Sequence, residues 1–442
     1  MATIIQSKLN NVNNTLVELK QRIIFLIFSI IIFRVGFFIP IPGINHTVLS
    51  NFLKLQNGTV IDLFNMFSGG ALSYASIFSL GIMPYISASI IMQLLTLTIK
   101  KLSNIKKSGE VGKKKINQYI RYITLLIAIF QSIGIALTLP NISSVAQMIE
   151  HPDLYFYFTT ILSLCTGTIL LMWLGELITE CGIGNGISMI MFIGIVAKMP
   201  LSISSMIRNM KLIHMSLLYL CFIFLLLFVL IFCIVFIESS YRKIVLYHSK
   251  QRNLHKMYVM QHTHLPLKIN MSGVIPAIFA SSVIILLSVV ISYFKVHVGF
   301  LFFSVLEYYI KPGTVCYILL YSILIFLFCF FYDNLVCNPR EISENLKKSG
   351  VFIPGIRPGI QTTRYINNII NRLIFLNALY IIFVVLIPEF FKITMHIPFF
   401  IGGNSLLIIV VVVIDFIAQF QTFMISNKYN IFLKKSPLRM NR

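Results

Sequence analysis

The chain has 442 residues, of which 57% are hydrophobic and 11% are charged, whereas an average soluble domain is about 25% charged. This composition excludes a soluble globular protein. The formal net charge of +22 would suit a nucleic-acid partner, but the basic residues gather in loops between apolar runs, which is typical of a membrane protein.

Apolar runs of about 18 or more residues predict membrane helices. The polar segment before the first run is too long for a cleavable signal peptide, so we expect the first helix to be permanent. If the spans alternate, most of the 36 lysines and arginines fall on the side of the N-terminus, which predicts that both termini are cytoplasmic. The ten candidate spans lie near 23–40, 76–95, 119–139, 155–175, 187–203, 215–237, 271–292, 315–336, 372–390 and 403–423.

The spans form two groups of five. Two units with an odd number of spans are inverted relative to each other, a common arrangement in membrane transport folds. We therefore predict an all-α polytopic membrane protein of two pseudo-symmetric, inverted five-helix halves. The predicted division is a cytoplasmic segment 1–22, an N-terminal half 23–203, a C-terminal half 215–423 and a cytoplasmic tail 426–442.

The second apolar segment is interrupted. Residues 62–93 read DLFNMFSGGALSYASIFSLGIMPYISASIIMQ, so a short piece ends in two glycines and a second piece follows, with Gly81 and Pro84 in its first turns. Broken backbone at membrane depth is tolerated only where protein or a water-filled cavity satisfies its polar groups. We expect a half-helix over 62–74 that folds back into a vestibule and plugs it.

The polar loop 239–268 is basic and predicted to be cytoplasmic. Apolar and polar residues alternate over 243–247 and 257–261, and this alternation favours a β-hairpin. The loop would project beyond the lipid, where a soluble partner can dock.

The polar loop 338–368 is also predicted to be cytoplasmic. Residues 341–348 are expected to form a short helix. Pro354 and Pro358 then enclose Arg357 and force a stiff, non-helical turn.

No catalytic motif stands out. The chain lacks G-x-S-x-G and H-E-x-x-H, and the glycine-rich run CGIGNG at 181–186 has neither the spacing nor the preceding strand of a nucleotide-binding loop. We expect no enzymatic activity, no cofactor, no metal and no small-molecule ligand.

An ion-coupled solute transporter is the alternative function. Such proteins keep ionisable residues at mid-membrane. We expect Glu176, Glu238 and Asp333 to lie near cytoplasmic span ends, where water reaches them. Asp415 is then the one acid well inside a late span, with Arg34 in the first span. The lack of a buried charge relay argues against the transporter.

A polypeptide channel needs a different constriction. An apolar ring that dewets blocks ions when empty, yet it stretches around a chain of any sequence. Ile82 and Ile86 share a helix face, as do Ile187 and Met191, because residues four apart are neighbours on a helix. Isoleucine is frequent throughout the chain, however, and packed or lipid-facing isoleucine is the default in a membrane helix.

Many separate motifs resemble the SecY family, the pore-forming subunits of the bacterial Sec translocon. The resemblance runs from about Leu16 to Tyr429 and implies a channel that translocates unfolded polypeptides and releases membrane segments laterally into the cytoplasmic membrane. The strings that carry it include FNMFSGGAL, SIFSLGIMPYISASIIMQLL, MWLGELITECGIGNGIS, THLPLKINMSGVIPAIFASS, CNPREISENLKKSG, IPGIRPGIQT and IPFFIGGNSLLIIVVVVIDFIAQ.

The resemblance also implies site residues. The pore ring falls on Ile82, Ile86, Ile187, Met191, Ile278 and Ile408. The plug falls on Asp62, Phe64, Asn65, Met66, Phe67, Gly69 and Gly70. Polar contacts of the lateral gate, between spans two and three and spans seven and eight, fall on Gln93, Gln131 and Asn270. Contacts with SecA or the ribosome fall on Arg242, Lys243, Lys250, Arg252, Lys256, Arg340, Lys347, Lys348 and Arg357.

The implied partners are the small subunits SecE and SecG, the SecA ATPase, the ribosome, signal-bearing polypeptides and membrane lipids. Basic loops suit ribosomal RNA phosphates and an acidic protein face equally well, or they only enforce topology. Three positions depart from the family pattern. Met191 replaces an isoleucine, and Cys181 and His255 replace arginines. Because of Cys181, residues 176–186 hold two acids and no base.

Overall fold

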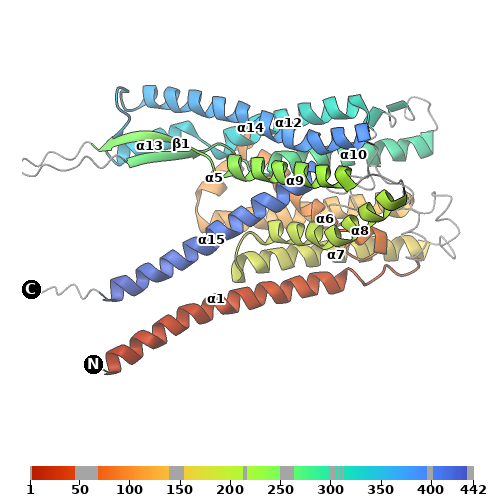
Figure 1. Ribbon diagram of the computed structural model, residues 1–442, viewed down its shortest axis with the longest axis horizontal. Helices are drawn as coiled ribbons and strands as arrows, with labels where there is room; N and C mark the ends of the chain where they lie inside the picture. Colours follow the sequence, from red (N-terminus) through yellow and green to blue (C-terminus); the bar gives the residue numbers. More distant parts are fainter. Residues whose placement is uncertain are drawn as a thin grey trace, which may run out of the picture. The chain divides into compact units, whose positions relative to one another are not determined.

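The computed structural model describes residues 2–44, 68–138, 154–212, 217–248, 263–298, 305–306, 309–310, 313–395 and 402–435. A helix overlaps each of the ten predicted spans (Figure 1), which confirms the predicted helical membrane fold. These helices are α1 Ala2–Gly36, α4 Met83–Thr98, α6 Glu110–Thr138, α7 Leu154–Cys181, α8 Gly186–Leu212, α9 Leu217–Glu238, α10 Ile275–Val298, α12 Val315–Val336, α14 Ile360–Met395 and α15 Gly403–Lys435. Shorter elements are η1 Ala71–Tyr74, α5 Lys100–Lys107 and α13 Pro339–Lys348.

Several helices are suited to lipid by length and surface. Among the described residues, six helices are long and apolar enough to cross a membrane, or up to seven if the bent pair α4–α5 is one span. On α9, Leu225, Phe228 and Phe232 are 62%, 70% and 64% exposed. A helix that is apolar on every face is stable only inside a large core or in a membrane, so these side chains indicate contact with lipid.

The chain divides into two compact units, which are described separately. The first unit is Met1–Ser205, Leu287–Glu307 and Val412–Arg442, and the second is Met206–Leu286 and Tyr308–Val411. The division of the ten spans into two inverted halves stays a prediction.

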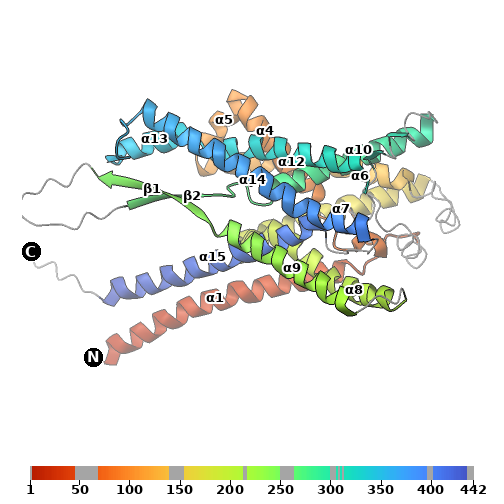
Figure 2. The ribbon, with the colours of Figure 1, turned by 45° about the horizontal axis from the view of Figure 1, so that its top comes forward.

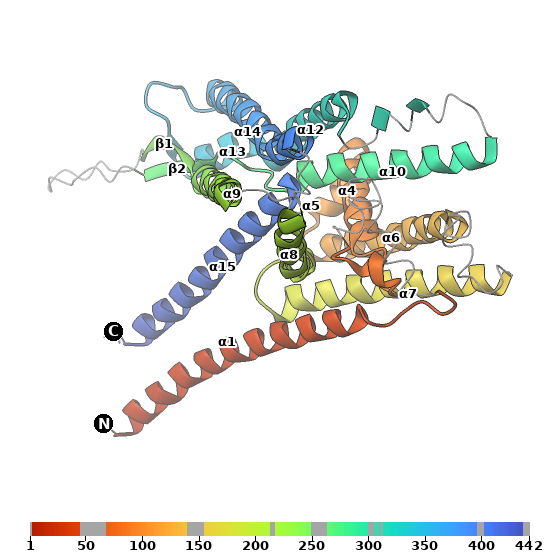
Figure 3. The same cartoon turned by 45° about the vertical axis from the view of Figure 1, so that its right-hand side comes forward.

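In the first unit, α4, α6 and α7 pack in succession, and α1 runs along α7 (Figure 3). Ala88 and Met92 of α4 are buried against Ile120 of α6. The segment before α4 approaches α7 closely, because a Cβ atom at Gly167 would lie 2.2 Å from the carbonyl oxygen of Ile77. A glycine is therefore required at this point of α7.

In the second unit, three antiparallel strands in the order β2-β1-β3 extend from the helices, and the β1–β2 hairpin is clear in Figure 2. The strands are β1 Tyr241–His248, β2 Thr263–Lys268 and β3 Val351–Phe352. The predicted hairpin and its first strand are confirmed, while residues 257–261, expected in the second strand, lie outside the described residues. Pro266 lies opposite Lys243, on an edge strand where a missing N–H group is tolerated.

The sheet and the first half of α14 share one apolar core. Ile244, Leu267 and Val351 from the three strands are buried with Ile366 and Ile370 of α14. This core fixes the two polar loops on the end of α14, and α14 in turn packs along α12.

The short helix predicted after the eighth span is confirmed as α13. Asn338 caps it by accepting a hydrogen bond from the backbone N–H of Arg340 at 3.2 Å. Proline at its first position loses no hydrogen bond, since the first N–H groups of a helix have no partner within it.

Candidate functional site

Two of the predicted ring residues lie where α4 begins. The helix starts at Met83 rather than at residue 76, because Gly81 turns with a φ of 60° and Pro84 occupies the first turn. Ile82 is 4% exposed, and its carbonyl accepts the backbone N–H of Ile86 at 3.2 Å. The two side chains therefore follow each other by one turn, as the sequence predicts.

Two further ring residues lie in the first turns of α8. The side chain of Asn185 accepts the N–H of Ile187 at 3.2 Å, and Thr179 of α7 accepts the N–H of Gly186 at 2.9 Å. A Cβ atom at Gly186 would lie 2.0 Å from the carbonyl oxygen of Gly175, so α7 and α8 pack through their backbones here. Ile187 is half-buried.

The remaining ring residues belong to the second unit. Ile278 lies in the first turn of α10 and is 4% exposed, and Ile408 lies near the start of α15 and is fully buried. Met191 on α8, which belongs to the first unit, is also largely buried at 9% exposed. Each of these side chains sits near a helix start, and their meeting in one ring stays a prediction.

The end of the predicted plug packs on α8. Gly69 and Gly70 both adopt left-handed backbone, with φ of 71° and 90°, directly before η1. A Cβ atom at Gly69 would lie 2.7 Å from Cα of Gly194, which is one turn beyond Met191. The plug residues Asp62, Phe64, Asn65, Met66 and Phe67 lie outside the described residues.

The predicted gate residues differ in their surroundings. Gln93 on α4 and Gln131 on α6 are half-buried, and Oε1 of Gln131 is buried with no hydrogen-bond partner among the described residues. A buried acceptor without a partner is rare. Asn270, in the second unit, is 1% exposed and is bonded within its own unit.

Two carboxylates lie at or near helix ends as predicted, but they are buried. Glu238 and Asp333 are each 1% exposed, so the expectation that water reaches them is wrong. Hydrogen bonds stabilise them instead: Asn270 donates to Glu238, and Asn377 donates to Asp333 at 3.1 Å. Sequence reasoning missed Asn377, although an amide inside an otherwise apolar helix is itself a signal.

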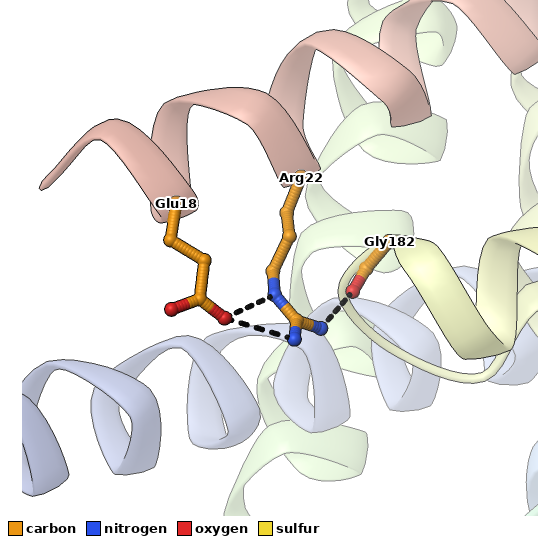
Figure 4. A network of polar contacts seen from close by, with 3 residues as sticks. All are labelled: Glu18, Arg22 and Gly182. Atoms are coloured by element: carbon orange, nitrogen blue, oxygen red, sulfur yellow. Dashed lines mark hydrogen bonds and ion pairs between the residues drawn. The ribbon is translucent and has the colours of Figure 1, made fainter. Parts of the chain in front are cut away.

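The end of α7 receives its basic partners from other helices. Arg121 of α6 forms an ion pair with Glu176. Arg22 of α1 bonds Glu18 at 3.1 Å and donates to the carbonyl oxygen of Gly182 at 3.2 Å (Figure 4). A cation is favourable beside the carbonyl groups that end a helix. Glu176 therefore does have a basic neighbour, in spite of Cys181.

Six of the predicted contact residues lie in the described part of the chain, and all six are exposed. They are Arg242, Lys243, Arg340, Lys347, Lys348 and Arg357. The remaining predicted contacts, Lys250, Arg252 and Lys256, lie outside the described residues. The same holds for His255.

Two side-chain hydroxyl groups hold the backbone of the turn that bears Arg357. Thr362, 3% exposed, donates its hydroxyl to the carbonyl oxygen of Arg357 at 2.9 Å. Ser343 of α13 donates to the carbonyl oxygen of Gly359 at 3.0 Å. The side chain of Arg357 is therefore displayed on a fixed backbone.

Known proteins share this architecture and most of this sequence. A family model described as SecY matches residues 76–417. The chain is 57% identical over 423 residues to "Protein translocase subunit SecY" of Buchnera aphidicola subsp. Schizaphis graminum, covering 95% of this chain and 96% of that protein. It is 53% identical over 422 residues to the protein of the same name in Escherichia coli strain K12, covering 96% and 95%.

Solved structures show the same fold. "The structure of a protein conducting channel" matches with a TM-score of 0.65 at 15% identity, covering 96% of this chain and 95% of that chain. "Sec61 in the Canine ribosome-channel complex from the endoplasmic reticulum" matches with a TM-score of 0.62 at 14% identity and the same coverage of both chains.

Proposed function

The chain belongs to the SecY family and is a subunit of a protein-conducting channel, and on this premise we propose how it is sealed. Apolar side chains at the starts of α4, α8 and α10 and on α15 form a ring that excludes water and ions when no polypeptide is present. The observation that carries the proposal is the packing of Gly69 on Gly194, which brings the end of the plug to within one turn of Met191.

The plug and the ring have separate tasks in this proposal. The plug, residues 62–74, blocks the vestibule, and the ring closes around a translocating chain. Side chains without polar groups suit the ring, because specific polar coordination would favour some polypeptide sequences over others. Met191 keeps the ring apolar and adds flexibility, since its side chain is unbranched.

The lateral gate is proposed to open between α4 and α6 on one side and α10 and α12 on the other. Membrane segments and signal sequences leave the channel for the lipid there. Gln131 supports this assignment, because its buried Oε1 has no partner in the described part of the chain. Gln93, half-buried on α4, is proposed to take part in the same contact.

We assign no reaction to this chain, and the energy for translocation comes from its partners. The proposed partners are the SecA ATPase, the ribosome, and the small subunits SecE and SecG. The exposed bases on the β1–β2 hairpin, on α13 and on the turn at Arg357 support docking of an acidic protein face or of RNA phosphates.

The proposed location is the bacterial cytoplasmic (inner) membrane, with both termini in the cytoplasm. The bias of basic residues toward the side of the N-terminus supports this orientation. The names of the relatives, which are protein translocase subunits, favour the channel over the alternative of an ion-coupled solute transporter.

Reconstitution tests the function directly. The chain is placed in liposomes with SecE and SecG, and a signal-bearing precursor is added outside with SecA and ATP. We expect a protease-protected precursor only when ATP is present. Saturable uptake of a small solute without SecA, and no protected precursor, would favour the transporter.

A further inference from the structure

Five polar side chains form a continuous buried network in the second unit. Glu238 ends α9, Asn270 and Ser272 lie between β2 and α10, Asp333 lies on α12, and Asn377 lies on α14. Their exposed fractions are 1%, 1%, 3%, 1% and 0% in that order. Polar groups are buried at this level only when hydrogen bonds replace those to water.

Asn270 uses its whole hydrogen-bonding capacity inside this unit. Its Nδ2 donates to Glu238 and, at 3.2 Å, to the carbonyl oxygen of Gly273. Its Oδ1 accepts from the N–H of Gly273 at 2.9 Å and from the hydroxyl of Ser272 at 3.3 Å. An amide side chain has two donors and two acceptor lone pairs, so none remains for a contact outside the unit. The geometry thus favours a role for Asn270 in shaping the turn.

Asn377 joins this turn to two other helices. Its Nδ2 donates to the hydroxyl of Ser272 at 3.1 Å and to Oδ2 of Asp333 at 3.1 Å. One amide group thereby connects α14, α12 and the segment that leads into α10. Replacement of one of these side chains by an apolar one leaves its buried partners without a hydrogen bond. This destabilises the protein more than the loss of a hydrogen bond between exposed groups does.

The network ends where α10 begins. Gly273 adopts left-handed backbone with a φ of 63°, a conformation that suits glycine. The carbonyl oxygen of Val274 then accepts the N–H groups of Ala277 at 3.1 Å and of Ile278 at 3.2 Å. The position of Ile278 therefore follows directly from the turn that the network holds.

We propose that Asp333 and Asn377 are positioning residues, which act through Ser272 and Asn270 to hold the first turn of α10, and with it Ile278, where the channel is closed. The inference rests on the proposed function, since it requires Ile278 to belong to the seal. It adds that buried side chains outside the ring set the balance between closed and open channel.

The test uses the full-length chain with its partner subunits in planar bilayers. Asn377→Leu removes both donated bonds with little change of volume, and Ser272→Ala removes the link to the turn. We expect either variant to raise the resting ion conductance per channel by roughly fivefold or more. Asp333→Leu should act like Asn377→Leu, whereas Asp333→Asn, which retains an acceptor oxygen, should have a smaller effect.

Matched controls separate positioning from general polarity. Asn334→Ala changes the next residue of α12, whose exposed side chain donates to the carbonyl oxygen of Phe330 at 2.9 Å. Asn368→Leu changes an exposed amide on α14. Both controls should conduct like the wild type.

Two results would overturn the inference. One is wild-type conductance of both Asn377→Leu and Ser272→Ala; the other is a loss of folded protein with unchanged conductance of the channels that remain. The second result would make the network a packing element only. Ile408→Asn is measured in parallel, because closed behaviour of that variant would count against the ring itself and not against the positioning residues.

Discussion

The guanidinium group of Arg121 on α6 donates two hydrogen bonds to the carboxylate of Glu176 on α7. Its Nε lies 3.0 Å from Oε1, and its Nη2 lies 2.7 Å from Oε2. Two parallel bonds of this kind are stronger and more directional than one. The side chain of Glu176 is 18% exposed and that of Arg121 is 49% exposed. The pair ties two helices of the first unit at one end, and α6 is one of the proposed gate helices.

We expect a double-mutant cycle with Arg121→Gln and Glu176→Gln to give a coupling free energy of about 0.5–1 kcal/mol, since the pair is partly exposed to solvent. Thermal unfolding of the purified protein in detergent measures it. The coupling should decrease at about 1 M salt, where charges are screened within a few ångströms. Strictly additive effects of the two substitutions would show that the ion pair does not stabilise the protein.

The second prediction concerns Gly69. Gly69→Ala forces an unfavourable left-handed backbone and places Cβ 2.7 Å from Cα of Gly194, so the end of the plug should separate from α8. We expect a rise in resting ion conductance. Gly194→Ala is the matched control, because its Cβ would meet Gly69 at an ordinary 3.5 Å. Equal conductance of the two variants would argue against this contact as part of the seal.

The third prediction concerns Arg357. Arg357→Glu should abolish precursor-stimulated SecA ATPase activity, and Arg357→Lys should reduce it, because an ammonium group cannot form the paired bonds of a guanidinium group. Thr362→Val should cause an intermediate loss by releasing the backbone at Arg357. The control Arg364→Glu changes another exposed arginine on α14 and should be active. Normal stimulation of Arg357→Glu at saturating SecA would rule out the contact.

The spans, the interrupted second segment and α13 could be predicted from the sequence because each depends on local pattern. Runs of apolar residues predict the helices, but the predicted start of the second span at residue 76 is wrong, because Gly81 and Pro84 place the start of α4 at Met83. The β1–β2 hairpin could be predicted in part, since its first strand alternates clearly and its second strand contains Pro266.

The buried network could not be predicted in the same way. Ser272 and Asn377 are 105 residues apart, and their contact depends on which helices become neighbours. Glu238 and Asp333 were expected near water because they lie at or near span ends. The structure buries them because amide and hydroxyl groups of other elements replace the water.

The ring residues were assigned from a family resemblance, since isoleucine is too frequent in this chain to be informative by itself. The structure adds that all six lie in the first two turns of a helix or directly before one, on α4, α8, α10 and α15. The turn before a helix fixes the position of the first residues of that helix. The glycines and the turn at Asn270–Gly273 therefore help to set where the ring side chains lie.

The resting conductance of Ile408→Asn, alone and combined with Ile82→Asn, tests the seal most directly. An amide in the ring binds water and weakens dewetting, so both variants should conduct ions without a polypeptide and export precursors with defective signal sequences. The double variant should conduct more than either single variant. Wild-type conductance of the double variant, with normal amounts of protein in the membrane, would contradict the ring.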